Sequence, residues 1–182
     1  VKATRGNIYS DNGSLLATSL PFYKVAMDPT LVKDDVFKEG IDSLSYLLSR
    51  YYKDCSATDC KRMIRDARET NKQYLVINRK QINYQVKKEM SSWPIFREGR
   101  LRGGVLFEKI DVRYRPFSHL SRRTIGFVNE NGNGAGLEYS FEKDLGGQDG
   151  EALFQKIAGG AWKPVFDANN IKAVDGMDIQ TT

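Results

Sequence analysis

Two short patterns in the sequence have the residue types of a serine acyltransferase. Ser140 and Lys143 show the S-x-x-K spacing, which sets a serine nucleophile one helical turn from the lysine that activates it. Ser10-Asp11-Asn12 spells a second motif of the same enzymes. Either pattern carries chemistry only if the surrounding elements hold its side chains together and away from water.

The periodicity around Ser140 argues against that chemistry. If residues 136–145 form a helix, Leu137, Phe141 and Leu145 recur at four-residue steps and define its buried stripe. At about 100° per residue, Lys143 then lies about 160° from the centre of the stripe and faces water. A lysine that activates a serine must be partly desolvated. We therefore predict that the S-x-x-K pattern belongs to a structural helix.

The second pattern fails on its order in the chain. Acyltransferases of this type carry S-x-x-K first, whereas Ser10-Asp11-Asn12 stands far before Ser140 in a turn between two apolar stretches. The third motif of these enzymes, Lys-Thr-Gly or Lys-Ser-Gly, occurs nowhere in the sequence. We expect that this chain is not itself an enzyme.

Length and composition set the broad class. The chain has 182 residues, of which 40% are hydrophobic and 28% charged, as in a globular protein of one or two compact units. No apolar run approaches the roughly 18–20 residues that span a bilayer. We expect any membrane segment to lie outside these residues.

Cysteine and histidine offer no metal site. Cys55 and Cys60 lack the spacing of zinc ligands, and His119 stands alone, so we expect no metal and no cofactor. The segment from Ser56 to Asp59 has the form of a capping box that opens a helix. In an oxidising compartment the two cysteines could form a disulfide with each other, although we favour free thiols.

The remaining pattern predicts an α+β fold of short mixed and antiparallel strands. An Asn-Gly turn indicates a hairpin over 5–18. A phase change in the strand 105–114 indicates a bulge near 108–109. The other predicted elements are a strand at 21–28, helices at 36–51, 57–69 and 82–90, a buried strand at 74–77, a short helix leading to Gly126, a loop at 129–136, and short strands within 152–157 and 170–179.

Three stretches in this order resemble motifs of a known module. "RGNIYSDNGSLLA" (5–17), "RYRPFSHLSRRTIGFV" (113–128) and "GLEYSFEKDLGGQDG" (136–150) are similar to the N-terminal, non-penicillin-binding module of class B penicillin-binding proteins. Ser10, Asp11, Arg115 and Ser118 depart from the family patterns. The site residues that the resemblance assigns to the structural and interdomain motifs are Arg5, Gly6, Ile8, Gly13, Leu16, Ala17, Arg113, Pro116, Gly126, Gly136, Leu137, Glu138, Phe141, Leu145, Gly147 and Gly150.

The resemblance implies an elongated pedestal with an inserted helical head. Residues 1–30 and 104–182 would form the pedestal core that carries the motifs, and residues 31–103 the inserted α/β head subdomain. The stretch "VDGMDIQTT" resembles the strand where the transpeptidase domain of the family begins. The serine-type peptidoglycan D,D-transpeptidase domain, with its active site, would therefore follow residue 182.

The resemblance also implies a role. The module would hold the transpeptidase away from the membrane and bind other membrane proteins of cell-wall synthesis, namely a SEDS-type glycosyltransferase and division or elongation proteins. It would lie on the periplasmic side, anchored by a transmembrane helix upstream of Val1. We favour the cell-division type over the elongation type. The resemblance is compatible with a homodimer, but the sequence does not decide the oligomeric state.

The opposite charges of Arg5 and Glu138 suggest how the first and third motifs meet. We hypothesise that the two side chains pair and lock the N-terminal hairpin to the helix that begins near Gly136. The alternative is that each side chain is solvated separately. If the pair forms, charge reversal at Glu138 should be rescued by reversal at Arg5.

A basic stretch leaves a second class of function open. Residues 97–123 hold eight Arg or Lys against three acidic residues, with aromatic residues between them. Such a stretch can bind nucleic acid or an anionic polymer, so an independent basic binding domain is the alternative function. We favour a solvated basic face and no nucleic acid as a partner.

Overall fold

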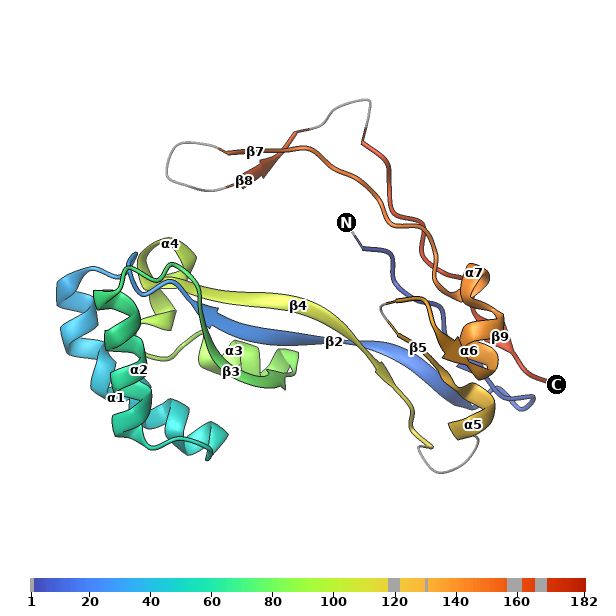
Figure 1. Ribbon diagram of the computed structural model, residues 1–182, viewed down its shortest axis with the longest axis horizontal. Helices are drawn as coiled ribbons and strands as arrows, with labels where there is room; N and C mark the ends of the chain where they lie inside the picture. The colour runs from blue at the N-terminus through green and yellow to red at the C-terminus, as the bar shows by residue number, and fades with distance from the viewer. Residues whose placement is uncertain (1, 118–121, 130, 157–161, 166–169) are drawn as a thin grey trace. The chain divides into compact units, whose positions relative to one another are not determined.

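The computed structural model describes residues 2–117, 122–129, 131–156, 162–165 and 170–182 (Figure 1). It divides the chain into two compact units, one of residues 1–20 and 111–182 and the other of residues 21–110. The boundaries of these units fall inside two strands, whereas the family resemblance implies domains of residues 1–30 with 104–182 and of residues 31–103. His119 and Ser118 lie outside the described residues. No helix in the described ranges is long and apolar enough to cross a membrane.

The elements confirm the expected α+β class. The α-helices are α1 (Asp34–Tyr52), α2 (Ala57–Glu69), α3 (Tyr84–Met90), α4 (Gly99–Gly103), α5 (Arg122–Ile125), α6 (Gly136–Ser140) and α7 (Glu142–Leu145), and Phe96–Glu98 is a 3₁₀ turn. The strands are β1 (Ile8–Tyr9), β2 (Leu15–Met27), β3 (Leu75–Ile82), β4 (Val105–Tyr114), β5 (Phe127–Val128), β6 (Gly134–Ala135), β7 (Phe154–Lys156), β8 (Trp162–Pro164) and β9 (Ile179–Gln180).

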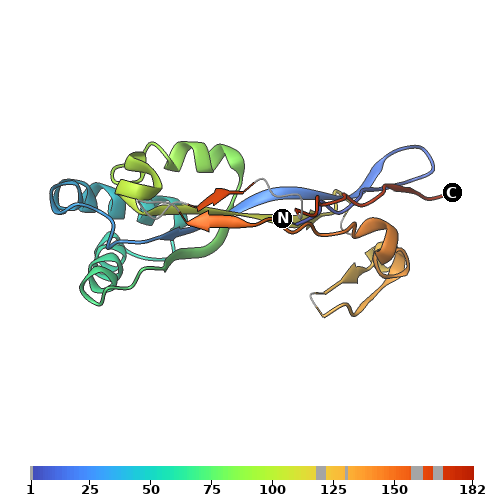
Figure 2. The same ribbon diagram turned by 90° about the horizontal axis from the view of Figure 1, so that it is seen from above.

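The unit of residues 21–110 is built around the second half of β2. This half pairs antiparallel with β3, and β2 also pairs with β4. Helices α2 (teal) and α3 (green) lie on opposite sides of these strands in Figure 2. The four-residue and three-residue spacing of apolar residues in 36–51 predicts a buried stripe at positions 37, 41, 44, 48 and 51, and the core takes Phe37, Ile41, Leu44 and Leu48 from α1. Position 51 is wrong, because the buried residue of the final turn is Tyr52.

The start of α2 is fixed twice. Ser56 caps the helix by accepting a hydrogen bond from the backbone N–H of Asp59 at 3.1 Å, as the capping box predicts. Cys55 and Cys60 form a disulfide across the same turn, with their Cα atoms 6.3 Å apart. The preference for free thiols was therefore wrong. A spacing of five residues across a helix start brings the two Cα atoms within disulfide range.

Strand β3 differs from its prediction. The sequence predicts a buried strand at 74–77, but burial alternates, with Leu75 and Ile77 inside and Val76 41% exposed. One face of the strand therefore meets the core and the other faces outward. The strand runs on to Ile82, and the next helix begins later than predicted because Asn83 caps it with a hydrogen bond from Val86 N–H.

The unit of residues 1–20 and 111–182 begins with the predicted hairpin. Ile8 of β1 lies opposite Ala17 of β2, and Gly13 takes a positive φ of 79° in the turn. The C-terminal strand β9 pairs parallel to β1 on its other side. Part of the loop predicted at 129–136 is instead the second strand of a small antiparallel hairpin between β5 and β6.

Candidate functional site

The segment with the S-x-x-K pattern is not one regular helix. Helix α6 ends at Ser140 and α7 begins at Glu142, with Phe141 between them at φ −110°. Phe141 is 41% exposed and Glu138 only 1% exposed. The prediction that Phe141 belongs to the buried stripe was therefore wrong, because the break turns it outward. Ser140 and Lys143 are both exposed, so no desolvated lysine stands beside this serine.

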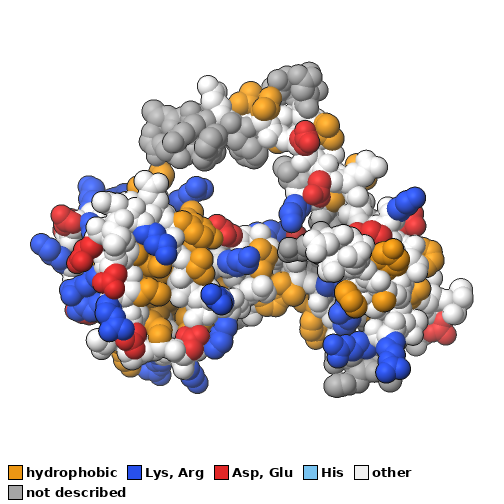
Figure 3. All heavy atoms as spheres, viewed as in Figure 1, with side chains coloured by type: hydrophobic (Ala, Val, Ile, Leu, Met, Phe, Trp, Pro, Cys, Tyr) orange, Lys and Arg blue, Asp and Glu red, His pale blue; other side chains and the backbone are white. Residues whose placement is uncertain are grey.

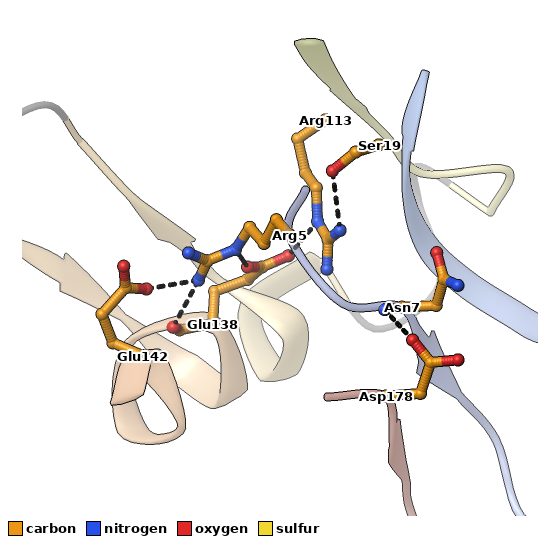
Figure 4. Close-up of polar contacts among 7 residues, drawn as sticks. All are labelled: Arg5, Asn7, Ser19, Arg113, Glu138, Glu142 and Asp178. Atoms are coloured by element: carbon orange, nitrogen blue, oxygen red, sulfur yellow. Dashed lines mark hydrogen bonds and ion pairs between the residues drawn. The ribbon is translucent and has the colours of Figure 1, made fainter. Parts of the chain in front are cut away.

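Glu138 forms the centre of a buried ion-pair network (Figure 4). Its Oε2 accepts a hydrogen bond from Arg5 Nε at 2.7 Å, and its Oε1 accepts one from Arg113 Nε at 2.7 Å. Arg5 Nη2 also donates to the backbone carbonyl of Glu138 at 2.9 Å. The ion pair hypothesised from the sequence is present, and Arg113 adds a second arginine to it. Glu138 thus connects all three motifs.

Two further side chains complete the network. Arg5 Nη2 makes an ion pair of 2.5 Å with Glu142 Oε2 at the start of α7. Arg113 Nη1 donates a hydrogen bond of 3.2 Å to Ser19 Oγ on β2. The network therefore connects the segment before β1, which carries Arg5, with β2, β4 and the α6–α7 segment within one unit.

The surroundings of the two arginines shift their pKa values in opposite directions. Burial alone would lower the pKa of Arg5, but hydrogen bonds to Glu142 and Glu138 outweigh it and raise that pKa. For Arg113, burial is the largest cause and lowers the pKa, and the hydrogen bond to Glu138 offsets it only in part. Both groups stay charged at neutral pH. Removing the Glu138 carboxylate would leave two poorly hydrated cations without their shared partner.

Close backbone contacts hold the first motif against the third. Gly6 N–H donates to the carbonyl of Leu145 at 2.9 Å, and Met177 N–H donates to Asp144 O at 2.8 Å. A Cβ at Gly6 would lie 2.0 Å from the Met177 carbonyl oxygen, so no other residue fits without moving the backbone. Asn7 N–H donates to Asp178 Oδ1 at 2.6 Å. We call the Glu138 network together with these backbone contacts the junction. The segment after residue 174 is part of it.

A small hydrophobic cluster lies beside the junction. Ile8, Ala17, Ile125 and Leu145 are all at most 1% exposed. Each motif contributes to it, because these residues come from the first, second and third motifs. The partly buried residues Leu16, Leu137 and Ile179 pack against the cluster.

The other predicted site residues are spread around the junction. Pro116 is exposed and makes no contact in the network, so the second motif acts through Arg113 and Ile125. Gly136 has φ +71°, and its backbone approaches Thr124 O so closely that an added Cβ would lie 2.5 Å from it. The remaining glycines contact backbone as follows: Gly126 with Ala135, Gly147 with Val174, and Gly150 with Ala173, whereas Gly13 stands in an open turn.

Sequence reasoning missed three contributors. Ser19 and Glu142 join the network, and Asp178 binds the first motif, yet none was singled out. The stretch 174–182 resembles the strand where the transpeptidase domain of the family begins, and its strand β9 pairs with β1 in this unit, within the range 104–182 that the resemblance assigns to the pedestal. Of these three residues, only Glu142 carried a signal in the sequence, because it is acidic and stands one helical turn after Glu138.

The sequence and fold both match known proteins. Residues 1–181 match the family model described as penicillin-binding protein dimerisation domain. Probable peptidoglycan D,D-transpeptidases PenA of Neisseria meningitidis and Neisseria gonorrhoeae are 26% identical over 179 residues, which are 97% of this chain and 28% of each relative. This chain thus spans 28% of the length of these curated relatives.

Solved structures show the same fold. Penicillin binding protein 2X of Streptococcus thermophilus matches with a TM-score of 0.68 at 22% identity, over 99% of this chain and 28% of that protein. A complex between PBP2 and MreC from Helicobacter pylori matches with a TM-score of 0.58 at 16% identity, over 99% of this chain and 35% of the matched chain. At these identities the likeness establishes the fold alone.

Proposed function

Because this chain belongs to the penicillin-binding protein dimerisation domain family, we propose that it is the non-catalytic module that positions a peptidoglycan D,D-transpeptidase domain for cross-linking. The observation that carries the proposal is the junction at Glu138. All three motifs meet there in ion pairs and backbone contacts, while Ser140 and Lys143 stay exposed. Such an arrangement fixes the relative positions of segments and offers no activated nucleophile.

The place of the C-terminal segment supports a mechanical role. Strand β9 pairs with β1, and Asp178 holds the backbone of Asn7. A transpeptidase domain that followed Thr182 would begin directly from a strand anchored in the junction. The rigidity of the junction would then limit the motion of that domain. We propose that residues 1–20 and 111–182 form the pedestal and residues 21–110 the head.

Partners and location follow from the same proposal. The module lies on the periplasmic side of the membrane, on a protein anchored by a preceding transmembrane helix, and serves septal synthesis. The PBP2–MreC complex from Helicobacter pylori supports binding of other cell-wall proteins. The name of the family supports a homodimer.

A positioning role separates from catalysis in one experiment. In the full-length protein, Glu138→Gln should leave the rate of acylation by labelled penicillin within about twofold, because the change lies outside the transpeptidase active site. Cross-linking of peptidoglycan in cells that carry only this variant should fall. Ser140→Ala with Lys143→Ala is the matched control, and both readouts should stay at the wild-type level. Penicillin bound covalently to Ser140 of residues 1–182 alone would refute the non-catalytic assignment.

The division role has its own readout. Cells that depend on the Glu138→Gln variant should form filaments, because septal cross-linking fails while the side wall still grows. Rounded cells would contradict the division role and favour the elongation type. Immunoblots at equal expression should accompany this test, so that a loss of the protein is not taken for a loss of positioning.

A further inference from the structure

A groove of about 670 Å³ lies between β3 and α2 in the unit of residues 21–110. The consecutive residues 76–79 of β3 form one wall. Helix α2 forms the other with Asp59, Arg62, Met63 and Asp66, which lie on one helix face at steps of three and four residues. This groove has no part in the Glu138 junction.

The groove follows the edge of β3. Neighbouring side chains of a strand point to opposite faces, as the buried Ile77 and the exposed Val76 show. The groove is lined by the inward-facing Ile77 as well as the outward-facing Val76, which places it at the edge of the strand. Among the described strands, β3 pairs only with β2. Its other edge thus offers backbone N–H and C=O groups to a further strand.

The middle of the groove is apolar. Met63, Val76 and Ile77 line it together with the Cys55–Cys60 disulfide. In Figure 3 a strip of hydrophobic side chains, bordered by charged ones, crosses the face of this unit that carries α2. Four residues of β3 span roughly 13 Å, which suits an extended segment of four to six residues.

Charges distinguish the two ends of the groove. Asp54 accepts a hydrogen bond from Asn78 Nδ2 at 2.9 Å, so the N-terminal end of α2 lies beside the middle of β3, at the Arg79 end of the groove wall. Arg79 therefore stands at one end and Asp66 at the other. Neither of these two side chains has a hydrogen-bond or ion-pair partner among the described residues. Asp59, in contrast, is paired with Arg62 at 2.8 Å.

We propose that this groove binds an extended segment of a partner protein, which adds to the free edge of β3 as a new strand. The segment carries apolar side chains toward Met63, an acidic residue at Arg79 and a basic residue at Asp66. A second copy of this chain fits poorly, because two facing grooves would both stay hollow and set their α2 walls against each other. The proposal gives a surface to the interaction role proposed above and rests on it.

Synthetic six-residue peptides test the proposal directly. The blocked peptides KVTVTE and EVTVTK match the two groove charges in the parallel and antiparallel orientation, respectively. We expect one of them to bind with a Kd on the order of 1 mM, and ¹⁵N chemical-shift changes to follow residues 76–79. The same peptide with alternate backbone nitrogens methylated should bind at least tenfold more weakly, because about two backbone hydrogen bonds are lost.

Variants of the protein test the role of the two groove charges in a second way, with both peptides left unchanged. The double variant Asp66→Lys with Arg79→Glu should exchange the preference between the two peptides, and Arg100→Glu, outside the groove, should leave it unchanged. Asp66 and Arg79 are both exposed, so the double variant should fold normally.

Four outcomes would overturn the proposal. They are no binding of either peptide at millimolar concentration, undiminished binding of the methylated peptide, an unchanged preference in the double variant, and self-association of the chain that Arg79→Glu abolishes. The last result would assign the groove to a second copy. Each of them leaves the Glu138→Gln experiment unaffected, so a failure here is distinct from a failure of the positioning role.

Discussion

Replacing Glu138 by Gln should destabilise the unit of residues 1–20 and 111–182 by about 3 kcal/mol. The carboxylate is 1% exposed and accepts one charge-assisted hydrogen bond from each of two arginines at 2.7 Å. A glutamine keeps the volume but offers one acceptor, and its NH₂ group would face the Nε–H of Arg5 or Arg113. Losing one such bond costs about 1.5–3 kcal/mol, and the charge left unpaired adds to it.

The assay is urea and thermal unfolding of the purified chain. A loss of about 3 kcal/mol corresponds to a fall in Tm of about 6–12 °C for a chain of this length. Glu142→Gln is the matched control, because its side chain is 43% exposed and its ion pair with Arg5 is worth only about 0.5 kcal/mol. A Glu138→Gln protein as stable as the Glu142→Gln protein would refute the view that the buried network holds the motifs together.

The structure also changes the expected result of the charge reversal. Because Arg113 shares Glu138 with Arg5, exchanging the charges of Arg5 and Glu138 would set an arginine at position 138 against Arg113. We therefore expect the double reversal to restore little stability. Full rescue would mean that Arg113 contributes nothing, and a triple-mutant cycle would measure its share.

Three further perturbations test other contacts. Gly6→Ala should lower the free energy of unfolding by about 3 kcal/mol, because the added Cβ would lie 2.0 Å from a backbone oxygen. Gly13→Ala should lower it by only about 1 kcal/mol of backbone strain, because no atom lies within 4 Å of the added Cβ. Equal losses of stability in urea unfolding would contradict the close contact at Gly6. Burial raises the pKa of Tyr52 above its unfolded value of about 10, so stability present at neutral pH should fall as the pH rises past about 10, and Tyr52→Phe should reduce that fall; parallel alkaline unfolding curves for the two proteins would refute this. Replacing Cys55 and Cys60 by Ala should destabilise the unit of residues 21–110 by about 2 kcal/mol. Dithiothreitol should lower the stability of the wild type by the same amount, and a wild type whose unfolding is unchanged by dithiothreitol would show that the bond is absent.

Local patterns predicted most elements but misjudged one helix. The stripe of α1 up to Leu48, the cap at Ser56 and the hairpin turn at Gly13 follow from residue spacing and turn chemistry, and the structure confirms them. The segment 136–145 does not follow its spacing, because the helix breaks at Phe141. The break leaves Glu138 buried between two arginines and Phe141 exposed, and the spacing of apolar residues within the segment carries no signal of those distant arginines.

The sequence by itself pointed to the family through the order of its three motifs. It also determined the α+β class, because turns, caps and helical stripes depend on neighbours along the chain. Only the tertiary structure decided that Glu138 is buried between Arg5 and Arg113, that strand β9 joins β1, and that β3 pairs with β2 alone among the described strands. The physical reason is distance along the chain: Arg5 and Glu138 are separated by 133 residues, and an ion pair leaves no periodic trace in the residues between them.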